Sequence, residues 1–136
     1  MNYLFYDLET TGTDQYFDQI LQFASVKTDS EFNQIGEPVN LLCQPRRDVV
    51  PSPGAYKTTC IDIEELQDKG ITEHELSQKI HELFVGEKNL CIVGYNSKEF
   101  DDKRIQTLLY RNLFDPYKWS WDYGNSRLDI YDLVKL

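Results

Sequence analysis

The 136-residue sequence lacks three features that mark special classes of protein. Its cysteines, Cys43, Cys60 and Cys91, are odd in number and form no CxxC pair, which argues against structural zinc and a disulfide framework. No apolar run approaches the roughly 18 residues that span a bilayer, and no charged-then-apolar leader opens the chain. We therefore expect a cytoplasmic protein in which Cys43 and Cys91 are small core residues.

Positive charge is also scarce. The chain carries 14 Lys and Arg residues against 23 Asp and Glu residues, a formal net charge of −9. This balance argues against broad electrostatic binding to nucleic acid by this chain alone. It is compatible with a site for divalent cations, because clustered carboxylates bind hard metals through oxygen. The length and the 40% hydrophobic content are sufficient for one domain with a core.

Short apolar runs bounded by polar or proline-containing segments predict four β-strands. They span residues 2–8, 19–28, 37–45 and 90–94. The polar segment 29–36 supplies a turn, and the "PSPG" stretch at 51–54 marks a loop.

Capping residues and apolar periodicity predict the helices. Thr72 and Glu75 form a capping box, and apolar side chains follow on one helix face: Leu76, Ile80, Leu83 and Phe84. We expect Ser97 to cap a second helix over 98–112, and a last helix to begin near Asp129. That helix has no Gly, Asn or Pro terminator, so we expect the chain to be cut off inside a domain. This order predicts an α/β fold, a mixed sheet flanked by helices.

Two carboxylates stand at the end of the first predicted strand, in the stretch "FYDLETTG". Residues i and i+2 of a strand face the same side, about 7 Å apart, so Asp7 and Glu9 point together while Leu8 points into the opposite layer. Like charges placed in this way repel each other and raise a pKa unless a cation neutralises them.

A third carboxylate opens the second helix, in "GYNSKEFDDKRI". At 100° per residue, Asp101 projects with Ile105 and Leu108, whereas Asp102 is rotated toward the edge of that face. We therefore expect Asp101 to be the carboxylate on the buried side, and a metal shared with Asp7 and Glu9 to compensate it. The alternative is that Asp101 merely caps the helix and the other two acids lie at a solvated strand end.

These two stretches resemble motifs I and II of the DEDD superfamily of 3′→5′ exonucleases. Longer blocks are similar to the bacterial exodeoxyribonuclease I family: "TDSEFNQIGEP", "PSPGAY", "CIVGYNSKEFDD", "YRNLFDPYKWSW" and "NSRLDIYDL". The resemblance runs from about residue 4 to the last residue. It implies a ribonuclease-H-like exonuclease fold whose first three strands are antiparallel, here C-terminally truncated.

The resemblance also implies the roles of several residues. Asp7, Glu9 and Asp101 match three of the four acids that hold two Mg²⁺ ions in the family, for which Mn²⁺ may substitute. Further residues match the family's support for that site and its contacts with the terminal nucleotide and the single strand: Leu8, Glu9, Thr10, Thr11, Asn96, Phe100, Tyr117 and Trp121.

The sequence departs from the family pattern in its third motif. That motif, His-x₄-Asp, supplies the general base and the fourth acid, and no histidine follows Asp101. The two histidines, His74 and His81, fall on the polar face of the first helix and are expected to be solvated. Residues 1–136 are thus expected to form a partial exonuclease domain with weak or no activity alone. Cys60 also replaces a family glycine.

A run of alternating aromatic residues and two basic residues give weaker indications of function than these motifs do. In "DPYKWSWDYGNSR", Trp119 is expected to cover a sheet edge, while Tyr117 and Trp121 stack on unpaired bases. Arg127 and Lys135 are expected to be solvated surface charges rather than phosphate contacts.

The function implied by the resemblance is removal of 5′-mononucleotides from the 3′ end of single-stranded DNA. The expected partners are single-stranded DNA and a single-stranded-DNA-binding protein, the latter through parts not present here. The truncated face is expected to favour self-association. Two alternatives remain: an RNA-trimming exonuclease of the same superfamily, and a non-catalytic acidic interaction module from a truncated gene.

Overall fold

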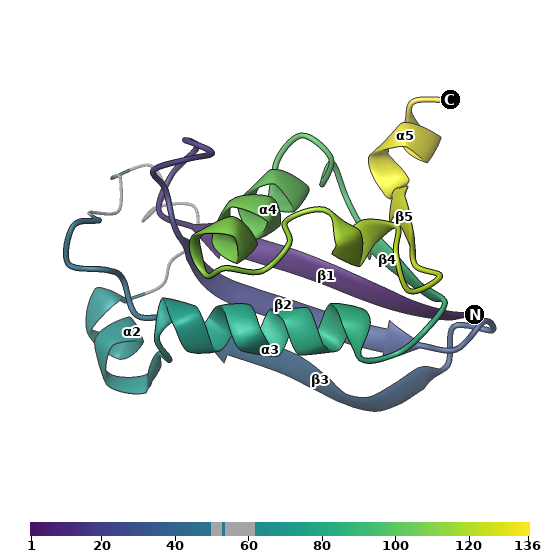
Figure 1. Cartoon of the computed structure of the whole chain (residues 1–136), viewed down its shortest axis with the longest axis horizontal. Coiled ribbons are helices and arrows are strands. Elements are labelled where there is room, and N and C mark those ends of the chain that lie inside the picture. The colour runs from purple at the N-terminus through teal and green to yellow at the C-terminus, as the bar shows by residue number, and fades with distance from the viewer. Residues whose placement is uncertain (50–52, 54–61) are drawn as a thin grey trace.

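The protein is described here by a computed structural model that covers residues 1–49, 53 and 62–136 (Figure 1). Five strands form one sheet in the order β3-β2-β1-β4-β5. Their bounds are β1 Asn2–Thr10, β2 Ile20–Thr28, β3 Gln34–Leu42, β4 Leu90–Gly94 and β5 Ser126–Asp129. The β1–β2 and β2–β3 pairs are antiparallel, whereas β4 runs parallel to both β1 and β5. The sheet is therefore mixed, and its first three strands are antiparallel as predicted.

Helices cover one face of this sheet. Two long helices, α3 and α4, lie over it together with a short 3-10 turn, η1 (Figure 1). The helix bounds are α2 Ile63–Lys69, α3 Glu73–Val85, α4 Asp101–Arg111, η1 Lys118–Ser120 and α5 Ile130–Val134. Within the described residues, no helix has the length and apolar character needed to cross a membrane.

The core lies between the sheet and the helices. Alternation along β1 turns Leu4, Tyr6 and Leu8 toward the helices, where they join Phe23 of β2 and Phe84 of α3. The Tyr6 ring stacks on Phe23 at a centroid separation of 5.9 Å, and the Phe84 ring meets Tyr6 edge-on at 5.5 Å. Such aromatic contacts stabilise the core beyond the burial of apolar area, and they fix how β1 lies beneath α3.

Several predicted elements are confirmed. The Thr72 side chain accepts a hydrogen bond from the Glu75 backbone N–H at 3.2 Å and caps α3, and Asp129 caps α5. Cys43 and Cys91 are buried free thiols. The "PSPG" loop and Cys60 lie outside the described residues, except for Pro53, which is exposed.

Other predictions were wrong. The residue preceding α4 is Phe100, not Ser97, and it makes no side-chain capping bond. The strand β5 and the helix α2 were not predicted. The four residues of β5, "SRLD", are too few to show a periodic pattern of apolar residues. β3 also begins three residues earlier than expected, at Gln34, and Cys43 lies beyond its end in an isolated bridge to Ile71.

Candidate active site

The carboxyl ends of the three parallel strands meet at one edge of the sheet. Register pairs Phe5 of β1 with Val93 of β4, and Gly94 of β4 with Asp129 of β5. β1 continues beyond the end of β4, so Asp7 and Glu9 project past it. The loop between β4 and α4 also starts at this edge and leads to Asp101. In open α/β sheets, ligands bind outside the carboxyl ends of the strands, so this edge is the expected position of a binding site.

Asp7 and Glu9 lie on the sheet face opposite the helices. Leu8 between them is buried in the core, whereas Asp7 is exposed and Glu9 is half-buried. The pKa of Glu9 is raised, first by burial and then by repulsion from the Asp7 carboxylate. The two charges therefore share one side of β1, as the period of a strand requires.

The structure brings Asp101 close to this pair. Burial raises the pKa of Asp101 from 3.8 to about 7, with repulsion from Asp7, Asp102 and Glu9 acting in the same direction and Arg104 opposing it. The three candidate acids thus form one electrostatic cluster, although they come from segments more than ninety residues apart.

One prediction about α4 was wrong. Asp102, not Asp101, is the more buried of the two consecutive aspartates, with 8% of its surface exposed. Both aspartates can reach the buried face of α4, and hydrogen-bond partners on distant strands determine which of the two is buried. Asp102 accepts hydrogen bonds from the Tyr6 hydroxyl at 2.5 Å and from Nε of Arg127 at 3.1 Å. Helical spacing alone cannot reveal such partners.

Arg127 is therefore not the solvated surface charge that its sequence context indicated. Its side chain is 11% exposed and forms an ion pair with Asp102. Its Nη2 also donates to the Ser97 hydroxyl at 2.8 Å, and its Nη1 donates to the Ile92 carbonyl. Lys135 is exposed and pairs with Asp132 at 3.3 Å.

The β4–α4 loop is held by an aspartate that the sequence indicated only as the approximate start of the last helix. Asp129 is buried, and its carboxylate accepts hydrogen bonds from the backbone N–H groups of Asn96 at 2.7 Å and Lys98 at 3.2 Å. Asn96 has a left-handed backbone with a φ of 53°. The bonds from Asp129 stabilise this conformation at the turn out of β4. Phe100, at the end of the loop, is exposed.

Thr10 and Thr11 follow the two acids of β1 and shape the next turn. The Thr10 hydroxyl donates to the Gly12 carbonyl at 2.8 Å. Thr11 is fully buried, and its hydroxyl donates to Asp18 at 2.7 Å while accepting from the Gln19 N–H at 2.9 Å. The side chain of Leu8 belongs to the core, so the backbone is the part of this stretch that can face a ligand.

The aromatic run after α4 separates into inner and outer residues. Trp119 is 1% exposed, and its ring stacks on Phe84 of α3 at 4.9 Å, so it packs in the core rather than presenting its ring to unpaired bases. Tyr117 and Trp121 are 59% and 64% exposed. Tyr117 lines a surface groove of about 270 Å³ together with the side chain of Tyr110.

The two histidines lie away from the acids. His74 is exposed, and its Nδ1 lies 3.2 Å from Oδ1 of Asn112, beyond the far end of α4 from Asp101. His81 is not solvated as expected: its ring stacks on Phe114 at 4.5 Å, and burial lowers its pKa. Neither ring is in position to accept a proton beside Asp7.

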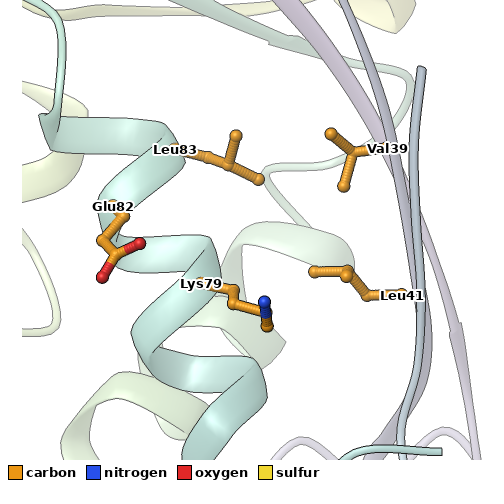
Figure 2. Close-up of a pocket in the computed structure, with 5 residues that line it drawn as sticks. All are labelled: Val39, Leu41, Lys79, Glu82 and Leu83. Carbon is orange, nitrogen blue, oxygen red and sulfur yellow. The ribbon is translucent and has the colours of Figure 1, made fainter. Parts of the chain in front are cut away.

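Two cavities differ in their relation to the acids. One, of about 400 Å³, lies against β1, β2 and β3 and has Asp7 among its lining residues. The other, of about 300 Å³, lies between β3 and α3 (Figure 2). Its lining residues are Val39, Leu41, Lys79, Glu82 and Leu83. Only the first adjoins the carboxylate cluster.

The donor set of the cluster fits a hard divalent cation. Among residues 1–49, 53 and 62–136, no three His, Cys, Asp or Glu side chains already stand in a metal-binding arrangement. The chemistry nevertheless suits such an ion, because Asp7, Glu9 and Asp101 offer carboxylate oxygens alone. Burial and then repulsion within the cluster raise the pKa values of Glu9 and Asp101, and a cation would relieve the repulsion.

Comparison with known proteins gives consistent matches along nearly the whole chain. The exonuclease family model (RNase_T) matches residues 4–136. Exodeoxyribonuclease I of Escherichia coli K12 is 46% identical over 133 residues, which cover 98% of this chain and 28% of that protein. The enzyme of the same name from Buchnera aphidicola (Acyrthosiphon pisum) is 42% identical, covering 98% of this chain and 32% of that protein. The chain therefore spans less than a third of the length of these relatives.

Solved structures agree with this result. The complex of E. coli exonuclease I with a dT13 oligonucleotide superposes with a TM-score of 0.95 at 45% identity, covering 98% of this chain and 29% of that chain. A zinc-bound form of the E. coli ExoI–ssDNA complex and an ExoI/SSB-Ct complex match equally well. The mixed five-stranded sheet with flanking helices is the ribonuclease-H-like exonuclease fold that the sequence predicted.

Proposed function

The chain belongs to the RNase_T exonuclease family, and from this membership we propose that it forms part of a 3′→5′ exonuclease acting on single-stranded DNA. The observation that carries the proposal is the cluster of Asp7, Glu9 and Asp101 at the carboxyl edge of the sheet. The E. coli relative with this fold binds single-stranded DNA oligonucleotides in its solved complexes. We extend that substrate class to this protein.

Asp7, Glu9 and Asp101 would hold two Mg²⁺ ions, for which Mn²⁺ may substitute. Bound there, the ions would activate water for in-line attack on the terminal phosphodiester and stabilise the departing 3′-oxygen. After burial, the Asp7 carboxylate makes the largest contribution to the raised pKa of both Glu9 and Asp101, so we propose that it would serve as a ligand of either ion. Asp101 would present its carboxylate from the first turn of α4, where the helix N-terminus favours negative charge.

Other residues position the strand around these acids. The β4–α4 loop, held by Asp129, would present Asn96 and Phe100 to the terminal nucleotide. The backbone at Thr10 and Thr11 would cradle its sugar. Tyr117 and Trp121, exposed on the surface, would stack on bases farther from the 3′ end. We further propose that the whole protein meets a single-stranded-DNA-binding protein, because an E. coli relative is solved with SSB-Ct.

No residue near the acids matches the histidine that serves as general base in the family. No histidine follows Asp101, and both His74 and His81 are committed to contacts elsewhere. We therefore expect residues 1–136 alone to bind metal and DNA weakly and to hydrolyse DNA slowly or not at all. A test of the metal site must then not depend on turnover.

The test is Mg²⁺- or Mn²⁺-dependent stabilisation of the protein. Metal is expected to raise the thermal unfolding midpoint of the wild-type protein, since a ligand that binds only the folded state stabilises it. Asp7→Ala is expected to abolish the increase. Glu31→Ala, which removes an exposed carboxylate from the β2–β3 turn, is the matched control and should behave as wild type. An equal increase in Asp7→Ala would contradict the proposal.

The activity itself is tested on DNA labelled at its 5′ end. In the whole exonuclease to which this chain contributes, incubation with Mg²⁺ or Mn²⁺ should yield a ladder that shortens from the 3′ end, and Asp7→Ala should yield none; residues 1–136 alone should yield at most a faint ladder. The same assay with an RNA oligonucleotide separates the proposed substrate from an RNA-trimming activity, because the 2′-hydroxyl is the feature that distinguishes the two.

A further inference from the structure

A buried polar cluster lies directly beside the candidate acids. Its members are Tyr6 of β1, Asp102 of α4 and Arg127 of β5. The Tyr6 hydroxyl and Nη2 of Arg127 both donate to Oδ1 of Asp102, and Nε of Arg127 donates to Oδ2 at 3.1 Å. Arg127 thus engages the carboxylate through two nitrogens, the arrangement that fixes both partners most firmly in orientation.

Arg127 makes two further hydrogen bonds. Nη1 donates to the Ile92 carbonyl of β4, and Nη2 donates to the Ser97 hydroxyl at 2.8 Å. The guanidinium carbon lies 5.7 Å from the centroid of the Tyr6 ring and 5.5 Å from that of Trp119. The first turn of α4 is therefore joined to β1, β4 and β5 through one side chain.

Two members of the cluster are sequence neighbours of the candidate acids. Tyr6 immediately precedes Asp7, and Asp102 immediately follows Asp101. The hydrogen bond from Tyr6 to Asp102 consequently joins β1 and α4 one residue away from each acid. Among the described residues, no other side-chain hydrogen bond links β1 to the first turn of α4.

The acid and the cation of this cluster pair with each other. Asp102 is paired with Arg127, so its carboxylate is engaged inside the protein, whereas Asp7, Glu9 and Asp101 repel one another. Burial of an ion pair contributes little net stability compared with an apolar group of the same shape, so its presence suggests a role in specifying geometry.

We propose that Tyr6, Asp102 and Arg127 are positioning residues that fix the separation between Asp7 and Asp101. This inference rests on the proposed function, because it matters only if those two acids bind metal together. None of the three contacts the metal or the substrate. They act by holding the two chain segments that carry the acids.

The variant that tests this most cleanly is Tyr6→Phe, which removes one hydroxyl from a buried ring and leaves its packing unchanged. Mn²⁺ affinity of the protein is measured by electron paramagnetic resonance of free Mn²⁺, and the unfolding midpoint is measured alongside. Loss of a group that orients metal ligands costs about 10–100-fold in metal affinity. We expect a weakening of about tenfold at the low end of that range. Tyr95→Phe, at an exposed ring, is the matched control and should not change affinity.

Arg127→Lys separates charge from geometry. Lysine keeps the positive charge beside Asp102 but cannot donate from two fixed nitrogens. We expect it to weaken Mn²⁺ binding about as much as Tyr6→Phe does. Should Arg127→Lys prevent folding, Tyr6→Phe decides alone.

The outcomes separate the two proposals. Wild-type affinity for Mn²⁺ in a folded Tyr6→Phe variant would overturn the positioning role and leave the proposed function intact. Failure of the wild-type protein to bind Mn²⁺, or equal binding by Asp7→Ala, would overturn the proposed function and the positioning role with it.

Discussion

Replacement of Asp101 by asparagine should stabilise the metal-free protein at alkaline pH. The pKa of Asp101 is raised from 3.8 to about 7, chiefly by burial and then by the Asp7 carboxylate. Because the folded-state pKa exceeds the unfolded value, the folded protein binds more protons than the unfolded chain between those pH values. The free energy of unfolding of the wild-type protein therefore falls as pH rises from about 4 to about 7. Asparagine cannot ionise and removes this loss.

The size of the effect follows from the shift. Roughly three pKa units correspond to a ceiling of about 4 kcal/mol at pH values above the folded pKa. Asp101 keeps part of its surface in water, and solvent screens its interactions, so we expect about 2 kcal/mol. The advantage of Asp101→Asn over wild type should be full near pH 8 and should shrink steadily as pH falls toward the unfolded pKa.

The assay is urea unfolding with a chelator present, at several pH values across this range. Glu31→Gln, at an exposed carboxylate in the β2–β3 turn, is the control and should track the wild type. Asp102→Asn should instead be less stable than wild type, because it weakens the bonds to Tyr6 and Arg127. An Asp101→Asn variant whose stability relative to wild type does not change with pH would refute the reasoning.

Three further outcomes are expected. Trp119→Ala should lower the free energy of unfolding in urea by about 3–5 kcal/mol, because the ring is buried against Phe84; a smaller loss than this would argue that its contacts are weak. Tyr117→Ala and Trp121→Ala should leave unfolding unchanged but each weaken binding of a fluorescent single-stranded oligonucleotide by about 1–3 kcal/mol, and unaltered anisotropy curves would count against a role in stacking. Sedimentation velocity should show concentration-dependent self-association, since Leu133 and Val134 of α5 are exposed apolar side chains; a monomer at all concentrations would contradict it.

The parts of the fold that could be predicted are those encoded by neighbouring residues. The apolar and aromatic run at residues 2–8 predicts the first strand, and the capping box at Thr72 predicts where α3 begins. The shared face of Asp7 and Glu9 follows from the period of two along a strand. Each of these inferences needs fewer than ten residues of sequence.

The parts that could not be predicted depend on contacts between distant segments. Arg127 is buried because Asp102, 25 residues earlier, and Ile92, 35 residues earlier, accept its hydrogen bonds. The ring of His81 is half-buried because Phe114 packs on it. Local periodicity places such side chains on a helix face or a strand, but it carries no information about which partner reaches them.

The consecutive aspartates of α4 show how the same residue type can serve opposite purposes. The charge of Asp102 is satisfied inside the protein by Arg127 and the Tyr6 hydroxyl. Asp101 instead faces other carboxylates, and Arg104 offsets them only in part. A perturbed carboxylate among like charges is typical of functional sites, where a bound cation supplies the missing positive charge. The raised pKa of Asp101 therefore supports the proposed cation site, and the pairing of Asp102 supports the proposed role of that residue in positioning it.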